Sequence, residues 1–120
     1  MTILFIGLGS IGQRHLRILK NLGKYNFIAV RSGKGKTTAS ELVDTEYSDI
    51  KELSGIGIDG AVISNPTSLH VETAIETAML GIPMFIEKPL GKNLDRIYEL
   101  EKIVKEKNIP VLMGYNLLYH

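Results

Sequence analysis

The sequence predicts a single α/β domain in which a parallel sheet is covered by helices on both faces. Short apolar runs alternate with helical patterns along nearly all of the 120 residues. The first apolar run, residues 3–6, is followed by a glycine-rich turn at residues 7–12 and then by a helical pattern. Strands that alternate with helices form parallel sheets through crossover connections. We therefore expect a three-layer, doubly wound sheet with strand order 3-2-1-4-5-6.

Each predicted element follows from its residue pattern. Strands are expected at residues 3–6, 27–30, 45–47, 61–64, 84–86 and 111–113, of which 45–47 is the weakest. Helices are expected at residues 11–22, 37–43, 49–54, 68–80 and 94–107. The helix from residue 68 has the clearest pattern, because Val71, Ala74 and Ile75 begin one apolar stripe that continues through residue 79. Segments 81–86 and 108–113 resemble each other, and each closes a helix and begins a strand.

Composition excludes several classes of function. A formal net charge of +1 gives no reason to expect nucleic acid or a membrane as a partner. The chain has no cysteine, so it has neither disulfides nor thiolate chemistry, and no cluster of histidines or carboxylates has the spacing of metal ligands. The N-terminus lacks the pattern of a signal peptide, and no apolar run is long enough to span a bilayer. We expect a cytoplasmic protein without a metal.

The glycine-rich turn has the spacing G-x-G-x-x-G between a predicted strand and a predicted helix. In a dinucleotide-binding Rossmann fold, the first glycine permits a tight turn and the second leaves room for a pyrophosphate. The third allows the helix to pack closely, with its positive end toward the phosphates. A purely structural glycine turn is the alternative. The residues expected to bind the cofactor here are Gly7, Leu8, Gly9, Ser10, Ile11 and Gly12.

The end of the second predicted strand bears on the choice between NAD and NADP. An NAD site commonly has an acidic residue there, about 20 residues beyond the glycines, to bind the ribose 2′-hydroxyl. This chain has Arg31 and Ser32 at that position, and the next acid is Glu41. Because arginine binds phosphate with two donors, we favour NADP over NAD. The alternative is a basic loop in which Ser32 alone binds the ribose of NAD.

Three further segments, read with the glycine turn, resemble one known family. They are Asn65-Pro66 with His70 after the fourth strand, Glu87-Lys88-Pro89 after the fifth, and Gly114-Tyr115-Asn116 after the sixth. Together they resemble the glucose–fructose oxidoreductase / inositol dehydrogenase / MocA family of nicotinamide-dependent sugar and imine oxidoreductases. The resemblance implies an enzyme of carbohydrate metabolism that transfers a hydride between NAD(P) and a sugar or a sugar-derived alcohol, ketone or imine.

The resemblance also assigns roles to residues. Lys88 is the expected catalytic residue, beside the reacting oxygen, although a solvated surface lysine is the plainer alternative. Glu87 is expected to hold a ribose of the cofactor, or else to pair with Lys88. The other expected cofactor-binding residues border the ribose and nicotinamide: Asn65, Pro66, His70 and Asn116. We expect a structural role for His70 to be at least as strong, and His15 to be a packed or crevice histidine.

The domain organisation implied by the resemblance is a cofactor domain over residues 1–120, with the C-terminal substrate domain absent from this chain. We therefore expect cofactor binding with negligible turnover. Leu118 stands where the family often has an arginine, which puts that substrate contact in doubt. Apolar residues near the end, such as Leu117, would favour association into a homo-oligomer if exposed. The alternatives are a stand-alone NAD(P)-sensing module, or a Rossmann domain for CoA or S-adenosylmethionine, against which Glu87-Lys88-Pro89 argues.

Overall fold

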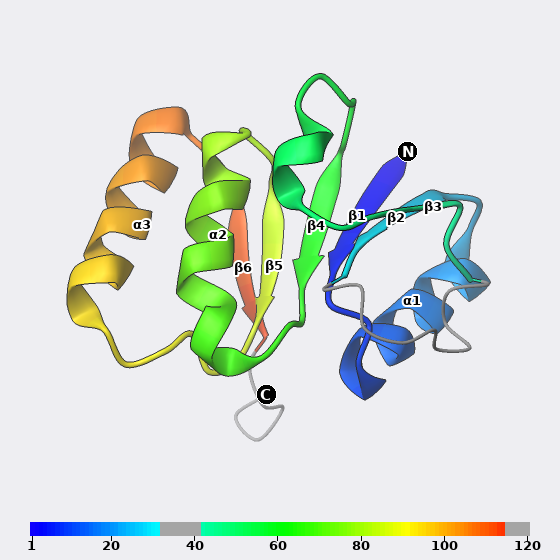
Figure 1. Cartoon of the computed structure of the whole chain (residues 1–120), viewed down its shortest axis with the longest axis horizontal. Helices are drawn as coiled ribbons and strands as arrows, with labels where there is room; N and C mark the ends of the chain where they lie inside the picture. The colour runs from blue at the N-terminus through cyan, green and yellow to red at the C-terminus, as the bar shows by residue number, and fades with distance from the viewer. Residues whose placement is uncertain (32–41, 115–120) are drawn as a thin grey trace.

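A computed structural model describes residues 1–31 and 42–114 of the chain (Figure 1). Its elements, in chain order, are β1 (Thr2–Ile6), α1 (Ser10–Leu22), β2 (Asn26–Val30), β3 (Thr45–Tyr47), the 3-10 helix η2 (Ile50–Leu53), β4 (Gly60–Ile63), the 3-10 helix η3 (Thr67–Leu69), α2 (His70–Met79), β5 (Met84–Glu87), α3 (Leu94–Lys107) and β6 (Val111–Gly114). Within these residues, no helix combines the length and the apolar character needed to cross a membrane.

The six strands form one parallel sheet in the order β3-β2-β1-β4-β5-β6, which confirms the predicted class and strand order. β1 lies in the middle, where Phe5 pairs with Ala29 of β2 on one side and with Val62 of β4 on the other. The chain reverses its direction of winding between β1 and β4. Ligands of such sheets bind beyond the carboxyl ends of the strands at this reversal.

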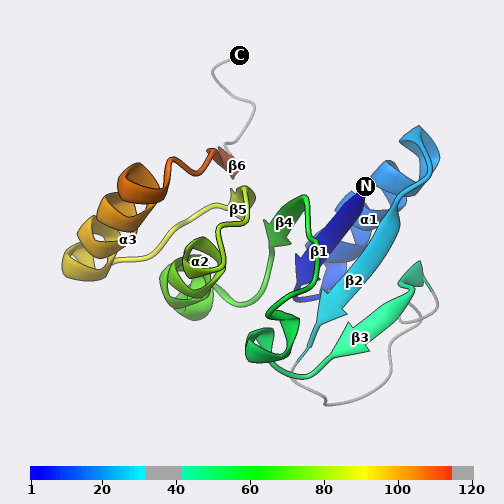
Figure 2. The ribbon, with the colours of Figure 1, turned by 90° about the horizontal axis from the view of Figure 1, so that it is seen from above.

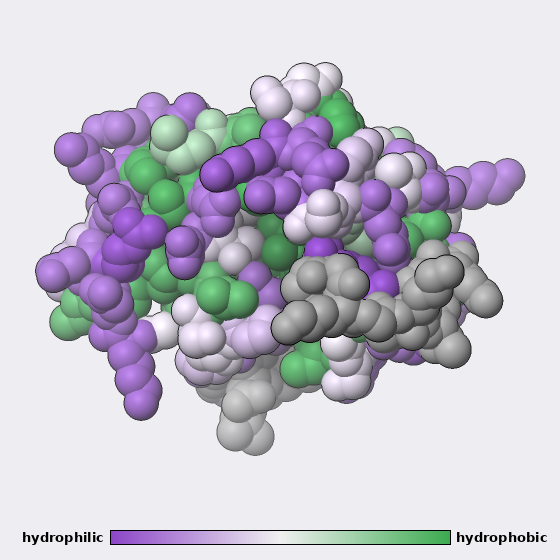
Figure 3. Space-filling view, viewed as in Figure 1, coloured by the Kyte–Doolittle hydropathy of each residue, from purple (hydrophilic) through white to green (hydrophobic). Residues whose placement is uncertain are grey.

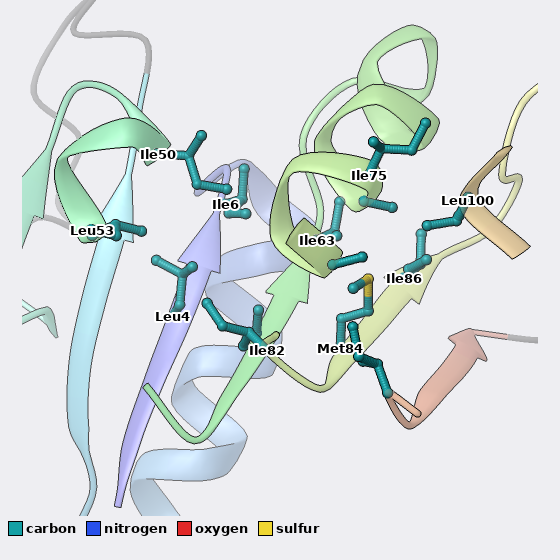
Figure 4. Close-up of a cluster of buried hydrophobic side chains, with 14 of the residues drawn as sticks. Leu4, Ile6, Ile50, Leu53, Ile63, Ile75, Ile82, Met84, Ile86 and Leu100 are labelled. Atoms are coloured by element: carbon teal, nitrogen blue, oxygen red, sulfur yellow. The ribbon is translucent and has the colours of Figure 1, made fainter. Parts of the chain in front are cut away.

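Alternation along the strands divides the core into two layers. Leu4, Ile6 and Ile63 belong to the larger cluster, which packs under α2, α3 and η2 (Figure 4). Phe5 and Phe27 belong to the smaller cluster under α1, and their rings meet edge to face with centroids 6.1 Å apart. Figure 2 shows α1 on the opposite side of the sheet from α2 and α3. The central strands are therefore buried on both faces, as expected for a doubly wound sheet.

The two faces are not equally covered. On the α1 side, an apolar hollow of about 490 Å³ lies over the beginnings of β4, β5 and β6, and Leu112 on its rim is 64% exposed. The outer surface of α3 on the other side is mainly hydrophilic (Figure 3). Two ion pairs lie on α3, one between Arg96 and Glu99 and one between Lys105 and Glu101.

Most predicted elements have the expected bounds within one or two residues, and α3 matches residues 94–107. The predicted helix 49–54 is instead a short 3-10 helix, in which Asp49 and Glu52 form a capping box. The predicted helix 68–80 begins with a separate 3-10 turn, because the Leu69 amide donates to the carbonyl of Pro66 at 2.9 Å before α2 starts. The predicted helix 37–43 lies mostly outside the described residues.

Candidate functional site

A crevice of about 860 Å³ opens at the carboxyl ends of the central strands. It lies where the winding of the sheet reverses, which is the position expected for a ligand in this class of fold. Four segments provide most of its lining: residues 6–11 from the end of β1, residues 30–31 from the end of β2, residues 48–51 after β3 and residues 64–67 after β4.

Two glycines of the β1–α1 turn are required by packing. Gly7 has a φ of 91°, and a Cβ added there would lie 2.7 Å from the Asn65 Cα. A Cβ at Gly12 would lie 2.6 Å from the Ser64 Oγ and 2.7 Å from the Gly7 carbonyl oxygen. The Ser64 hydroxyl donates to that same carbonyl at 3.0 Å. The turn is thus pressed against the end of β4, and side chains at Gly7 and Gly12 are excluded.

Gly9 is different, because packing does not require it. A Cβ at this residue would meet no atom of the described chain within 4 Å, and its backbone is extended, with a φ of −69°. Gly9 caps α1, which has neither a side-chain cap nor an acidic residue in its first turn. The first amides of a helix lack partners within the helix and favour anions. The space beside Gly9 therefore fits a phosphate group bound by the start of α1.

The end of β2 is held against β3. The Arg31 amide donates to the Tyr47 carbonyl at 3.1 Å, and its guanidinium Nη1 lies 3.1 Å from the Glu46 Oε1. Arg31 lines the crevice as expected, but Ser32 lies outside the described residues. Sequence reasoning missed Glu46, which is separated from Arg31 by 15 positions and is brought close only by the pairing of β2 with β3.

The end of β4 contributes Asn65 and Pro66 to the crevice. The Asn65 Nδ2 donates to the Thr73 hydroxyl of α2 at 2.8 Å. Its Oδ1 is buried and has no hydrogen-bond partner within residues 1–31 and 42–114. A buried acceptor without a partner is costly, so this atom fits a donor from a bound molecule.

His70 is buried directly behind these residues. Its side chain is only 2% exposed, its Nε2 lies 2.6 Å from the Asn65 carbonyl oxygen, and its Nδ1 lies 2.8 Å from the Pro89 carbonyl oxygen. Both ring nitrogens are thus directed at backbone of the same chain. This favours the structural interpretation of His70, in which the ring joins the loop after β4 to the loop after β5.

The end of β5 carries Glu87, Lys88 and Pro89, and the Lys88–Pro89 peptide bond is cis. The Glu87 carboxylate is hydrogen-bonded to the His15 ring of α1. That ring also packs edge to face on Phe85, with centroids 5.4 Å apart, so His15 has the packed role, one of the two that were expected. Lys88 is exposed at this edge of the sheet. Asn116 lies outside the described residues.

Gly114 in β6 makes the arrangement at Glu87 possible. A Cβ at Gly114 would lie 2.9 Å from the Phe85 ring and 3.2 Å from the Glu87 Oε2. Sequence reasoning did not identify the pair between His15 and Glu87, which lie 72 positions apart. The available signal was weak: one histidine on the helix that opens at the glycine turn, and one acid at the end of a buried strand.

One carboxyl group of the crevice has a shifted pKa. Burial raises the pKa of Glu76, and the negative charges of Glu72 and Asp49 raise it further, while Lys51 opposes the shift. Glu76 lies on α2 and lines the crevice. Across the part of the chain that the structure describes, no three histidine or acidic side chains gather closely enough to hold a metal ion.

Comparison with known proteins places these features in a family. Myo-inositol 2-dehydrogenase of Thermotoga maritima is 30% identical over 121 residues, which are 97% of this chain and 36% of that protein. The crystal structure of myo-inositol 2-dehydrogenase from Lactobacillus plantarum has a TM-score of 0.82 and 31% identity, over 95% of this chain and 36% of that one. Scyllo-inositol dehydrogenase from Lactobacillus casei, solved with NAD(H) and scyllo-inositol, shares the fold, with a TM-score of 0.82 at 21% identity over 95% and 36%.

This chain therefore spans just over a third of the length of these relatives. The profile of one family, described as an oxidoreductase family with an NAD-binding Rossmann fold, matches residues 1–115. That match covers the crevice and, except for Asn116, the segments on which the resemblance was based. The chain belongs to the glucose–fructose oxidoreductase / inositol dehydrogenase / MocA family and forms its NAD-binding Rossmann domain.

Proposed function

We propose that this chain is the cofactor domain of an oxidoreductase that transfers a hydride between NAD(P) and a sugar or a sugar-derived alcohol, ketone or imine. The observation that carries the proposal is the open space beside Gly9. Packing does not require a glycine at this residue, and the space lies at the start of α1, which has no side-chain cap. Asn65 in the same crevice supports it, because its Oδ1 has no hydrogen-bond partner among the described residues. Relatives named as inositol dehydrogenases support a polyhydroxylated substrate.

Different residues would bind different parts of the cofactor. The amides at the start of α1, after Gly9, would bind the pyrophosphate. Arg31 and Ser32 would bind the adenosine ribose, and because Arg31 replaces the usual acid we propose NADP as the preferred form. On the nicotinamide side, Asn65 and Pro66 border the ribose, and Glu87 would accept a hydrogen bond from it. His70 would support both loops from behind, and Asn116 would complete this side.

Lys88 is the proposed catalytic residue. When bound, the nicotinamide ring supplies hydride chemistry at its C4 carbon. Lys88 stands at the carboxyl end of β5 and is exposed, so its ammonium group can reach a substrate placed over the crevice. It would donate a hydrogen bond to the substrate oxygen, which stabilises the negative charge that develops there during hydride transfer.

We further propose that residues 1–120 act with a second, substrate-binding domain, since the relatives are almost three times as long as the stretch they share with this chain. Such a domain would supply the substrate pocket and the groups that exchange protons. Positioning and proton transfer each contribute factors of about 10² or more to a rate. This chain alone should therefore bind cofactor and turn over negligibly.

The decisive experiment is a titration of the chain with NADPH and with NADH, followed by nicotinamide fluorescence at physiological salt. Saturable binding of either cofactor is the expected result, and tighter binding of NADPH, weakened by Arg31→Asp, would support the NADP assignment. Circular dichroism of the same sample establishes that the chain is folded. A folded chain that binds neither cofactor contradicts the proposed function. A preference for NADH would contradict only the assignment of Arg31.

A further inference from the structure

Arg31, the residue that faces the adenosine end of the crevice, is already paired with an acid. Its guanidinium Nη1 lies 3.1 Å from the Glu46 Oε1. The Arg31 side chain is only 13% exposed, whereas that of Glu46 is 39% exposed. An ion pair with one largely buried member is screened by water less than a pair on the open surface.

The other acids that follow β3 are engaged elsewhere. The Glu52 carboxylate accepts hydrogen bonds from the Ser48 amide, the Ser48 hydroxyl and the Asp49 amide. The Asp49 carboxylate accepts from the Lys51 amide at 2.9 Å. These hydrogen bonds cap the start of η2. Glu46 is therefore the acid that this region directs at Arg31.

The sheet fixes the pair from both sides. β2 and β3 run parallel, with Ala29 opposite Glu46 and Val30 opposite Tyr47. The Arg31 amide donates to the Tyr47 carbonyl, which continues the ladder one residue past the end of β2. The backbones of Arg31 and Glu46 are thus held in register by the sheet. Their side chains meet because of this strand pairing.

We propose that Glu46 is a positioning residue that determines how strongly the crevice distinguishes NADP from NAD. This inference rests on the proposed function. A 2′-phosphate is bound by arginine through two parallel donors. At this site it must compete with the Glu46 carboxylate for the guanidinium, and the carboxylate also repels it. The 2′-hydroxyl of NAD is neutral and experiences neither effect, so Glu46 lowers the selectivity for NADP that Arg31 would give by itself.

The test is a double-mutant cycle on cofactor binding. The dissociation constants of NADPH and NADH are measured for the wild type, Glu46→Gln, Arg31→Gln and the double variant. We expect Glu46→Gln to raise the selectivity for NADPH by about 5-fold, as for the removal of one partly screened like charge. In the Arg31→Gln background the same substitution should give a smaller gain, because only the direct repulsion between the carboxylate and the 2′-phosphate remains. The gain should shrink as salt is raised.

Glu99→Gln is the matched control, because Glu99 also pairs with an arginine but lies on α3. It should leave the selectivity unchanged. The selectivity ratio would not respond to a general loss of stability, which weakens both cofactors alike. An unchanged ratio in Glu46→Gln, or a gain without Arg31 as large as the gain with it, would overturn the inference while leaving the proposed function intact. Failure of the wild type to bind either cofactor would instead overturn both.

Discussion

The two strand ends that the site residues occupy, the glycine turn after β1 and the end of β5, are built by different means. At the glycine turn, the shape depends on backbone and on the absence of side chains, because Gly7 and Gly12 lie against the end of β4. At the end of β5, the shape depends on side chains, because the His15 and His70 rings hold Glu87 and the Pro89 loop. The first end tolerates no added atom at its packed positions. The second end depends on hydrogen bonds that single substitutions remove.

The largest effect should come from Gly7→Ala. The added Cβ would lie 2.7 Å from backbone atoms of Asn65, and the φ of 91° disfavours any L side chain. Steric overlap and the unfavourable dihedral together should lower the free energy of unfolding by roughly 2–5 kcal/mol. Urea denaturation measures this. Gly57→Ala is the control, since no described atom lies within 4 Å of its Cβ position. A loss no greater than in the control would refute the packing argument.

His70→Ala should come next, and it tests the link between the loops that follow β4 and β5. The substitution leaves the Asn65 and Pro89 carbonyl oxygens without their partner and opens a cavity behind them. We expect a loss of about 2–4 kcal/mol in unfolding free energy. The neighbouring Leu69 is 44% exposed, so Leu69→Ala should cost much less in the same denaturation experiment. Equal losses in the two variants would mean that the His70 contacts contribute little.

Gly9→Ala separates binding from folding at the glycine turn. Because the Cβ would meet no described atom, we expect the unfolding free energy to change by less than about 1 kcal/mol. A bound pyrophosphate would meet the new methyl group, and overlap of about 1–3 kcal/mol corresponds to roughly 5- to 150-fold weaker binding. Fluorescence titration of NADPH and NADH measures this change. Wild-type affinity in this variant would show that the cofactor does not approach Gly9.

The smallest effect should come from Glu76→Gln. The pKa of Glu76 is raised in the folded chain, so the folded state binds its proton more tightly than the unfolded state. The ionised carboxylate is therefore unfavourable above the raised pKa, and stability increases as the pH falls through that pKa toward the unfolded value. Glu76→Gln should stabilise the chain at pH 7 by less than about 0.5 kcal/mol. The gain should vanish at acidic pH, and a gain independent of pH would contradict the assigned cause.

The difference between the two ends also explains what the sequence could predict. The strands, their order and the glycine turn depend on local patterns, and a turn of six residues carries its own geometry. The pairs at the other sites join distant positions: His15 and Glu87 are 72 positions apart, and His70 and Pro89 are 19 apart. Such contacts depend on how a helix packs against the end of a strand. A local sequence pattern carries no information about that packing.

The cofactor assignment stands between these two cases. Arg31 could be identified from its place after the second strand, whereas its partner Glu46 depends on the register of β2 against β3. A single residue at the end of a strand therefore gives the sign of a binding preference. The size of that preference depends on a neighbouring residue, here Glu46, which is identified only once the pairing of the strands is known.

The His70 ring has a consequence for how the crevice can move. Because it links the backbone after β4 to the backbone after β5, a displacement of either loop would break a contact of the buried His70 ring. The glycine turn across the crevice is anchored separately, through the Ser64 hydroxyl and the Gly7 carbonyl. A dinucleotide bound in this domain would therefore lie between two walls that are anchored independently of each other.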